Sequence, residues 1–344
     1  MFTVYAEKEI FENIVLFNDT YPNWYKIFSN HSEVCLNITD AELDAELKQG
    51  TPIFEYIMAN AGKEPIALKD FFDDIHLDKS IVAEKPRAAF LLNYPKVETD
   101  AMQNSYGIIV QNKDNIDDNI LKGTYFKNLP KNLVVENQQC IGWKKLLNFS
   151  IPPSNSMVIN DEYLFTNEEN RNIIGQFNVL HLIDSLLPHN LDIPYHILIV
   201  TTQKNKSNEW YERLAGNLKA QIISLRQYPI VFELVFTDSI HKRKLILNYV
   251  NATCDKGFAI FKVSDNKTVR ETNDFRFDRI FNRIDPHEGD SDYTDAHLIL
   301  TELKSICDEA KHSISTSAVH IHNKRILGDC NPDKSLKNRL INDV

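Results

Sequence analysis

The stretch IPYHILIVTT (residues 193–202) opens the part of the sequence that decides the fold. It is an apolar run of strand length, and SNEWYERLAGNLKAQIISLR (residues 207–226) follows it with an apolar residue at every fourth position from Trp210, the spacing of one helix face. A second apolar run, IVFELVF (residues 230–236), comes next, and the basic stretch HKRKLILN (residues 241–248) follows it. Strand, helix, strand and strand in this order predict an α/β sheet with helices packed on it.

The sequence around this stretch extends the same pattern. Upstream, SMVINDEYLFTN (residues 156–167) alternates as a strand does, and IGQFNVLHLIDSLLP (residues 174–188) has helical spacing. Downstream, HKRKLILN leads through YVNATCDKG (residues 249–257) to FAIFKV (residues 258–263), and a long helix is predicted from about Tyr293 to Lys311. Residues 131–344 are therefore expected to form one domain, a mixed sheet flanked by helices.

The region before residue 131 shows a second alternation of strands and helices. Strands are predicted at residues 9–17, 32–39, 87–94 and 107–112, helices at residues 39–62 and 67–75, and a helix or turn at residues 97–106. The first helix should begin at Thr39 or Asp40, because Glu42 follows at capping-box distance, and end near Gly62. A polar stretch that contains Pro130 places a domain boundary near residue 130. Residues 1–130 are expected to form an α/β sandwich-like domain.

The composition is that of a globular protein. The chain has 344 residues, 43% of them hydrophobic and only 10 of them glycine, which is enough to bury two cores. Its first residues lack the features of a signal peptide and no apolar run approaches the length of a membrane helix. We therefore expect a cytoplasmic protein without a membrane partner. The five cysteines are far apart and form no C-x-x-C pair, so neither a disulfide framework nor a zinc site is expected.

The charge is distributed unevenly along the chain. Its net charge is −10, and residues 1–130 carry 12 Lys and Arg against 21 Asp and Glu (net −9), which leaves 26 against 27 (net −1) for residues 131–344. A strongly acidic first domain argues against wrapping nucleic acid over the whole surface. The second domain, whose cations are clustered, is the better candidate for an anionic ligand.

The basic stretch HKRKLILN contains a degenerate catalytic pattern. His241, Arg243 and Asn248 have the spacing of H-x-K-(x)4-D, with arginine for the lysine and asparagine for the acid. On a strand, residues i and i+2 point the same way, so a histidine and a cation two apart can face one phosphate. Together with the strand, helix and strand before it, this pattern resembles one half of the phospholipase D superfamily over residues 155–262.

The resemblance implies a phosphodiester site that has lost its catalytic set. In the family the histidine attacks phosphorus, the lysine balances charge on the phosphate oxygens, and a second copy protonates the leaving group. Arginine still binds phosphate but has a different shape, and Asn248 cannot carry the charge of an acid. The family's following Gly-Ser and Asn are also missing. A phosphate-binding site at His241, Arg243 and Lys244 is the expected remnant.

A stricter match occurs near the end of the chain. HNKRILGD (residues 322–329) contains His322, Lys324 and Asp329 at the family's spacing, although no convincing apolar strand precedes it. A metal-independent phosphodiesterase or nuclease that uses His241 or His322, completed by a homodimer, is therefore the alternative function.

Three other groups of residues were weighed as sites. Arg276 and Arg279, with Arg270 and Arg283, lie among aromatic residues and could hold phosphates and stack bases, but Asp274, Asp278 and Asp285 alternate with them, and a self-paired surface is the preferred interpretation. Asp19, Asp40, Asp100 and Asp114 fall near predicted strand or helix ends, as metal-binding acids do in PIN-like nuclease folds, but a solvated acidic surface is preferred. His320 and His322 lack a third ligand, so no metal is expected, and no dinucleotide, P-loop, zincin or hydrolase motif predicts a cofactor.

Taken together, the sequence predicts a non-catalytic module that binds the phosphates of a nucleic acid or nucleotide, or serves as a scaffold. By analogy with degenerate nuclease domains, its setting would be a bacterial defence or nucleic-acid-processing complex with a protein partner. A protein–protein interaction module, in which the acidic first domain docks on a basic partner, is the third alternative.

Overall fold

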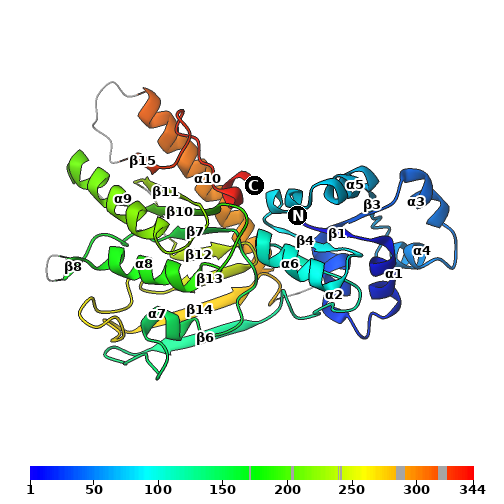
Figure 1. Cartoon of the computed structure of the whole chain (residues 1–344), viewed down its shortest axis with the longest axis horizontal. Coiled ribbons are helices and arrows are strands. Elements are labelled where there is room, and N and C mark those ends of the chain that lie inside the picture. Colours follow the sequence, from blue (N-terminus) through cyan, green and yellow to red (C-terminus); the bar gives the residue numbers. More distant parts are fainter. Residues whose placement is uncertain (170–171, 203–204, 239, 241, 284–290, 317–323) are drawn as a thin grey trace.

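Two β-sheets lie side by side in an elongated α/β molecule (Figure 1). The computed structural model describes residues 1–169, 172–202, 205–238, 240, 242–283, 291–316 and 324–344. The first sheet has the order β3-β2-β1-β4-β5 with all neighbouring strands parallel. Its strands are β1 (Phe2–Ala6), β2 (Ser32–Leu36), β3 (Ile66–Ala67), β4 (Ala88–Leu91) and β5 (Ile109–Gln111).

Helices cover both faces of the first sheet, as in doubly wound folds. One face packs on α1 (Lys8–Leu16), α2 (Pro22–Lys26) with the following π-helix (Ile27–His31), and α4 (Pro52–Ala59). The other face packs on α5 (Lys69–Leu77), the 3-10 helix (Lys79–Glu84) and α6 (Lys96–Tyr106). Because both faces are covered, β4 is fully buried and β1 is buried except at Thr3, so neither strand shows the alternation of a sheet with one exposed face.

Two sequence expectations for this unit are wrong. Residues 9–17 form helix α1 rather than a strand, because their apolar residues Ile10, Phe11, Ile14 and Val15 have helical spacing and lie buried on one face. The single helix expected over residues 39–62 is two helices, α3 (Asp40–Glu46) and α4, since Gly50 adopts a φ of +95° and Pro52 starts a new helix. The capping box between Thr39 and Glu42 is confirmed.

The second sheet is mixed, with the order β15-β11-β10-β7-β12-β13-β14-β6. Strands β7, β10 and β11 are parallel to one another, and all other neighbours are antiparallel. Its strands are β6 (Thr124–Leu129), β7 (Ser156–Asn160), β10 (Tyr195–Thr201), β11 (Ile230–Phe236), β12 (Lys244–Leu247), β13 (Val250–Cys254), β14 (Asn273–Arg279) and β15 (Arg325–Gly328). The chain thus passes from the first sheet to the second between Gln111 and Thr124, ahead of the boundary near residue 130 that the sequence suggests.

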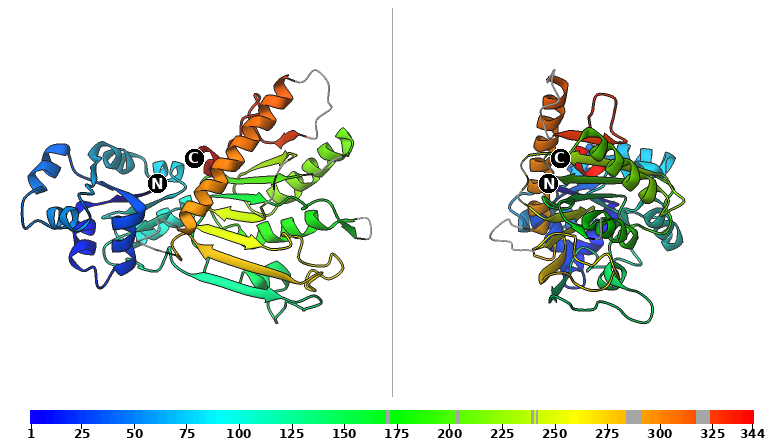
Figure 2. Two further views of the ribbon diagram at one scale, coloured as in Figure 1. Left: turned by 180° about the vertical axis from the view of Figure 1, so that it is seen from behind. Right: turned by 90° about the vertical axis from the view of Figure 1, so that its left-hand side faces the viewer.

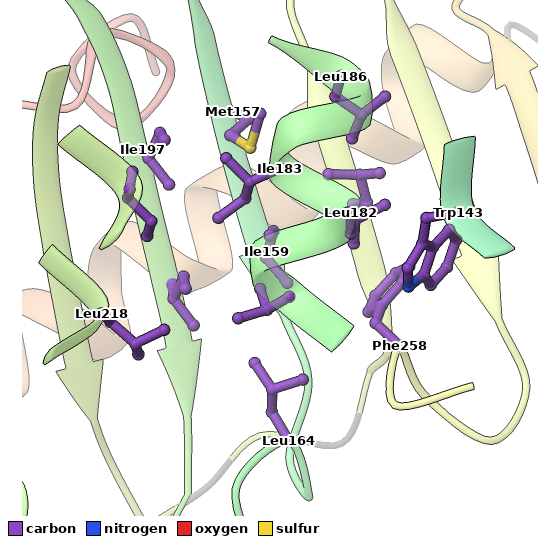
Figure 3. Close-up of a cluster of buried hydrophobic side chains, with 14 of the residues drawn as sticks. Trp143, Met157, Ile159, Leu164, Leu182, Ile183, Leu186, Ile197, Leu218 and Phe258 are labelled. Atoms are coloured by element: carbon purple, nitrogen blue, oxygen red, sulfur yellow. The ribbon is translucent and has the colours of Figure 1, made fainter. Parts of the chain in front are cut away.

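Helices also cover both faces of the second sheet (Figure 2). On one face lie α7 (Gly142–Leu146), α8 (Ile174–Leu186) and α9 (Asn208–Ile223), and on the other α10 (Asp292–Thr316) and α11 (Arg339–Asn342). Figure 3 shows the first of these cores, where Ile159 and Ile197 meet Ile183 of α8 and Leu218 of α9. A short hairpin of β8 (Glu168–Glu169) and β9 (Asn172–Ile173) precedes α8. Residues 258–263 form no strand of the sheet, and Phe261 makes an isolated bridge to Val269.

The two units share a buried junction. Asn155 donates from Nδ2 to the carbonyls of Ala83 (3.2 Å) and Tyr106 (3.0 Å). Arg87, just before β4, donates from Nη2 to the carbonyl of Tyr293 and stacks on that ring at 3.9 Å. The amino end of β7 therefore faces the first unit, and the carboxyl ends of β7, β10 and β11 lie at the far end of the molecule (Figure 1).

Candidate functional site

The carboxyl edge of the second sheet is the candidate site. The chain runs from β7 to β10 and on to β11 in one direction, and then returns to place β12 on the other side of β7. In open α/β sheets, ligands bind outside the carboxyl ends of the strands, next to the point where the strand order reverses. The residues that follow β7 and precede β12 lie at this point.

Arg243 lies directly before β12 at this edge. Its Nη1 donates to the carbonyl of Asp255, and its guanidinium carbon is 5.5 Å from the centre of the Tyr163 ring. Its Nε is buried and has no hydrogen-bond partner within the described residues. Tyr163 is half exposed, so this cation and ring form a surface that is open on one side.

A buried carboxylate, that of Asp161, lies close enough to Arg243 to feel its charge. Asp161, directly after β7, is 2% exposed and accepts hydrogen bonds from the amides of Tyr163 (3.1 Å) and Phe258 (2.8 Å). Burial raises the pKa of Asp161, while the two amides and the charge of Arg243 oppose that rise. Gly257 adopts a φ of +84°, and a Cβ there would lie 2.5 Å from Asp161 Oδ2, so the loop after β13 can close on Asp161 only with glycine at this position.

Two more cations lie over aromatic rings at the carboxyl ends of β10 and β11. Lys206 Nζ is 5.4 Å from the centre of the Trp210 ring, at the start of α9, where Ser207 caps the helix by accepting from the Trp210 amide. Arg325, opposite Phe236 at the end of β11, has its guanidinium carbon 5.4 Å from the centre of the Tyr211 ring. With Arg243 and Tyr163, three cation–aromatic pairs lie along one edge of the sheet.

Arg243 and Lys244 do not share one site. They are adjacent on an extended chain, so their side chains leave opposite faces of the sheet. Leu245 follows the Arg243 side and packs in the core with α8, whereas Ile246 follows the Lys244 side and packs in the core with α10. Burial lowers the pKa of Lys244, which faces Asp278, Asp292 and Asp295 on that second side.

Asn248 lies at the other end of β12 from Arg243. It is fully buried; its Oδ1 accepts from the amides of Asn155 (3.2 Å) and Ser156 (3.1 Å), and its Nδ2 donates to Asn155 Oδ1 (3.1 Å). The amide side chain thus fixes the start of β7 and does not reach the carboxyl edge. His241 lies outside the described residues.

The second motif does not converge within the described residues. Lys324 precedes β15 and Asp329 follows it, so the two lie at opposite ends of this strand. Asp329 accepts from Lys219 Nζ (2.6 Å) and from the Phe232 amide (3.1 Å), contacts that fix β15 against β11 and α9. His320 and His322 lie outside the described residues.

The arginines of β14 and its flanks are engaged with acids and carbonyls. Arg276 donates from Nε to Asp278 (2.5 Å), and Arg283 pairs with Asp292 and Asp295. Arg279 donates to the carbonyls of Asn119, Ile120 and Ser150, and Arg270 to that of Ala259. Of these arginines, Arg276 pairs with one of the acids that alternate with them, and Asp285 lies outside the described residues.

The described part of the chain contains no group of three or more His, Cys, Asp or Glu side chains that could hold a metal ion. The candidate acids Asp19, Asp40, Asp100 and Asp114 therefore form no such group. Asp40 begins α3, and Asp100 pairs with Lys96 on the surface of α6. No helix in the described ranges is long and apolar enough to cross a membrane.

Sequence reasoning missed most of this edge. Asp161, Tyr163 and Lys206 lie outside both motifs and Arg325 is at a variable position of the second, and all four lie at one edge because β7, β10 and β11 end side by side. Their one sequence signal is position: each lies within a few residues of a strand end.

Comparisons with known proteins identify no family. No family model matches the chain, and no curated protein matches it significantly. Among solved structures, the chain is similar to one titled as that of TrmBL2, an archaeal chromatin protein with a novel mode of DNA binding. The two share 10% identity over 79% of this chain and 91% of that one, with a TM-score of 0.22, a value too low to establish a common fold.

Proposed function

We propose that the second unit binds the phosphates of a nucleic acid or nucleotide at its carboxyl edge, without cleaving them, and that it is a degenerate phospholipase D-like module. The observation that carries this proposal is the two cation–aromatic pairs at the surface of this edge, Arg243 with Tyr163 and Lys206 with Trp210. Guanidinium and ammonium groups bind phosphate oxygens, and aromatic rings stack on bases. Tyr163 is half exposed and Trp210 is partly exposed, so a ligand that carries both groups can use both halves of these two pairs, whereas Tyr211 is buried and only fixes the position of Arg325.

The geometry around Arg243 favours binding over catalysis. The phospholipase D reaction needs a histidine and a lysine on one phosphate, with an acid in the same motif. Here the cation at the lysine position is an arginine that already donates to the carbonyl of Asp255, and Asn248 is built into the start of β7. Such a site would hold a phosphate ester without the charge balance that cleavage needs. A place in a bacterial defence or nucleic-acid-processing complex remains part of this proposal.

Fluorescence anisotropy of labelled single-stranded and double-stranded DNA and RNA, across a salt series, tests the proposal. Binding should weaken as salt rises, and Arg243→Gln and Lys206→Gln should each weaken it about tenfold, by loss of a charge-assisted contact. Arg276→Gln is the matched control, because this arginine is also exposed but is paired with Asp278 on the opposite face. Equal loss in Arg276→Gln, or no binding at any salt, would refute binding at this edge.

The same samples test the enzyme alternative. Gel analysis after long incubation, with magnesium and with chelator, should show intact nucleic acid. Cleavage in chelator that His241→Ala abolishes would replace the binding proposal with a phosphodiesterase. Absence of both binding and cleavage would leave the protein-interaction alternative.

A further inference from the structure

A cavity of about 710 Å³ lies at the junction of the two units. It is at the opposite end of β10 from the cation–aromatic edge, since His196, the second residue of β10, lines it. The first unit contributes Glu84 and Lys85, and the C-terminal segment contributes Lys337, Arg339 and Asp343. The size falls within the range of small-molecule sites, which is roughly 300–1,000 Å³.

Arg339 is an incompletely satisfied cation in this cavity. Its side chain is 10% exposed, its Nη1 donates to the carbonyl of Pro194 (2.7 Å), and its Nη2 is 3.5 Å from Glu84 Oε1. Its Nε is buried and has no hydrogen-bond partner in the described part of the chain. Leaving a buried charged donor unpaired is unfavourable, so an acceptor that binds this guanidinium would stabilise it.

His196 presents a hydrogen-bond acceptor beside that cation. Its Nδ1 is 2.8 Å from the carbonyl of Lys337, and a carbonyl only accepts, so Nδ1 carries the proton. Burial, with the nearby charges of Arg339 and Lys337, lowers the pKa of His196 to about 4. At neutral pH the ring is therefore uncharged, and its Nε2 can accept a hydrogen bond from a hydroxyl group.

The charges around the cavity suit an anion. Lys85, Lys337 and Arg339 contribute three positive charges, against the two carboxylates of Glu84 and Asp343. The Glu84 side chain is 70% exposed, so it can swing into solvent and release the guanidinium at little cost. Glu84 thus holds the position that the oxyanion of a ligand would take.

We propose that this cavity binds a small phosphate monoester that also carries a hydroxyl group, and that the ligand ties the two units together. The phosphate takes the guanidinium of Arg339 with the ammonium groups of Lys85 and Lys337, and the hydroxyl donates to His196 Nε2. Residues of both units line the cavity, so a bound ligand stabilises their junction. This inference is independent of the function proposed for the carboxyl edge.

Calorimetric titration and thermal unfolding of the full chain with ribose 5-phosphate test it. Saturable binding and a rise in Tm are expected, with weaker binding of inorganic phosphate and none of ribose at equal ionic strength. Arg339→Met should lower the affinity for ribose 5-phosphate at least tenfold. Glu84→Gln should raise that affinity several-fold, because the competing carboxylate is removed. Arg276→Gln is the control and should bind as the parent does, because this arginine does not line the cavity and is paired with Asp278.

Two outcomes would overturn the proposal. The first is that ribose 5-phosphate gives neither saturable heat nor a Tm shift with the parent. The second is that Glu84→Gln leaves the affinity unchanged or lower; because Glu84 is exposed, this variant should fold and decides the question even if Arg339→Met does not.

Discussion

The hydroxyl of Tyr249, in the turn between β12 and β13 of the second unit, donates a hydrogen bond to the carbonyl of Ala88 on β4 of the first unit (2.5 Å). The same oxygen accepts from the Ile109 amide at the start of β5 (3.0 Å). Tyr249 is fully buried, and burial raises its pKa, which keeps it protonated and able to donate. One side chain thus joins two strands of one sheet to a turn of the other.

Removing this hydroxyl should therefore weaken the junction. Tyr249→Phe leaves a buried carbonyl and a buried amide without partners, which should lower the free energy of unfolding by about 1–3 kcal/mol. Urea unfolding followed by circular dichroism measures this change. Tyr163→Phe, whose ring is half exposed, is the control and should change stability by less than about 0.5 kcal/mol. Equal stability of Tyr249→Phe and the parent would show that these hydrogen bonds contribute nothing.

Replacing Asn248 by aspartate, the acid of the H-x-K-(x)4-D motif, should damage the fold rather than create activity. In Asn248→Asp an ionised carboxylate still accepts from the amides of Asn155 and Ser156, but it no longer donates to Asn155 Oδ1 and meets that oxygen instead. We expect a loss of about 1–3 kcal/mol at pH 7. The loss should shrink at pH 4, where a protonated Asp can donate. A variant as stable as the parent at both pH values would contradict the structural role of Asn248.

Glu233 should make stability depend on pH. It lies in the middle of β11, and burial raises its pKa to about 7, although the amides of Lys337 and Asn338 donate to it and oppose the rise. Between the unfolded pKa near 4.5 and the folded pKa near 7, the folded state holds a proton that the unfolded state has released. The contribution of Glu233 is therefore present below pH 4.5 and is lost as pH rises to 7, by up to about 3 kcal/mol.

A difference between two proteins isolates this contribution. The free energy of unfolding of the parent minus that of Glu233→Gln should fall as pH rises from 4.5 to 7, because glutamine does not titrate. Other groups, including His196 with its opposite trend, cancel in the difference. A difference that stays constant across this range would mean that Glu233 is ionised in the folded protein.

Gly257 should be intolerant of any side chain. Its positive φ disfavours other residues, and an added Cβ would also press on the carboxylate of Asp161. We expect Gly257→Ala to cost about 2–4 kcal/mol. Gly50→Ala is the matched control, because Gly50 also has a positive φ (+95°) but no atom lies within 4 Å of its added Cβ, and about 1 kcal/mol is expected there. Thermal unfolding of both variants measures the two costs: Gly50→Ala reports the backbone strain alone, and Gly257→Ala reports the strain together with the clash against Asp161.

Sequence patterns predicted where many helices and strands lie along the chain, but not which strands pair in the sheets. The α8, α9 and α10 helices and strands β7, β10 and β11 follow from periodicity, because each packs one face or is buried as an uninterrupted apolar run. The α1 segment was predicted to be a strand because its nine residues are rich in Ile, Phe and Val, which favour strands. Its helical period shows only in the spacing of the pairs Ile10–Phe11 and Ile14–Val15. The strand order of either sheet is a non-local property that periodicity does not contain.

The candidate site was even harder to predict from the sequence. Arg243 came from a motif, but its partners Tyr163 and Asp161 lie about 80 residues away in sequence, and their approach depends on β12 pairing with β7. The same pairing separates Arg243 from Lys244 and Asn248, because a strand turns successive side chains to opposite faces and spaces them by about 3.3 Å. A motif of spacing alone could not anticipate either result.

The position of β6 bears on how this chain can be divided. A fragment that starts at residue 131 would lack β6, whose backbone pairs with β14 from Asn273 to Asp278. In that fragment the seven-residue strand β14 would become an unpaired edge strand. Exposed edge strands pair with other chains, so the fragment would tend to aggregate. Cutting within residues 112–123 instead would leave β6 in place as the outer strand, and only a fragment cut there is a fair test of whether the second unit folds alone.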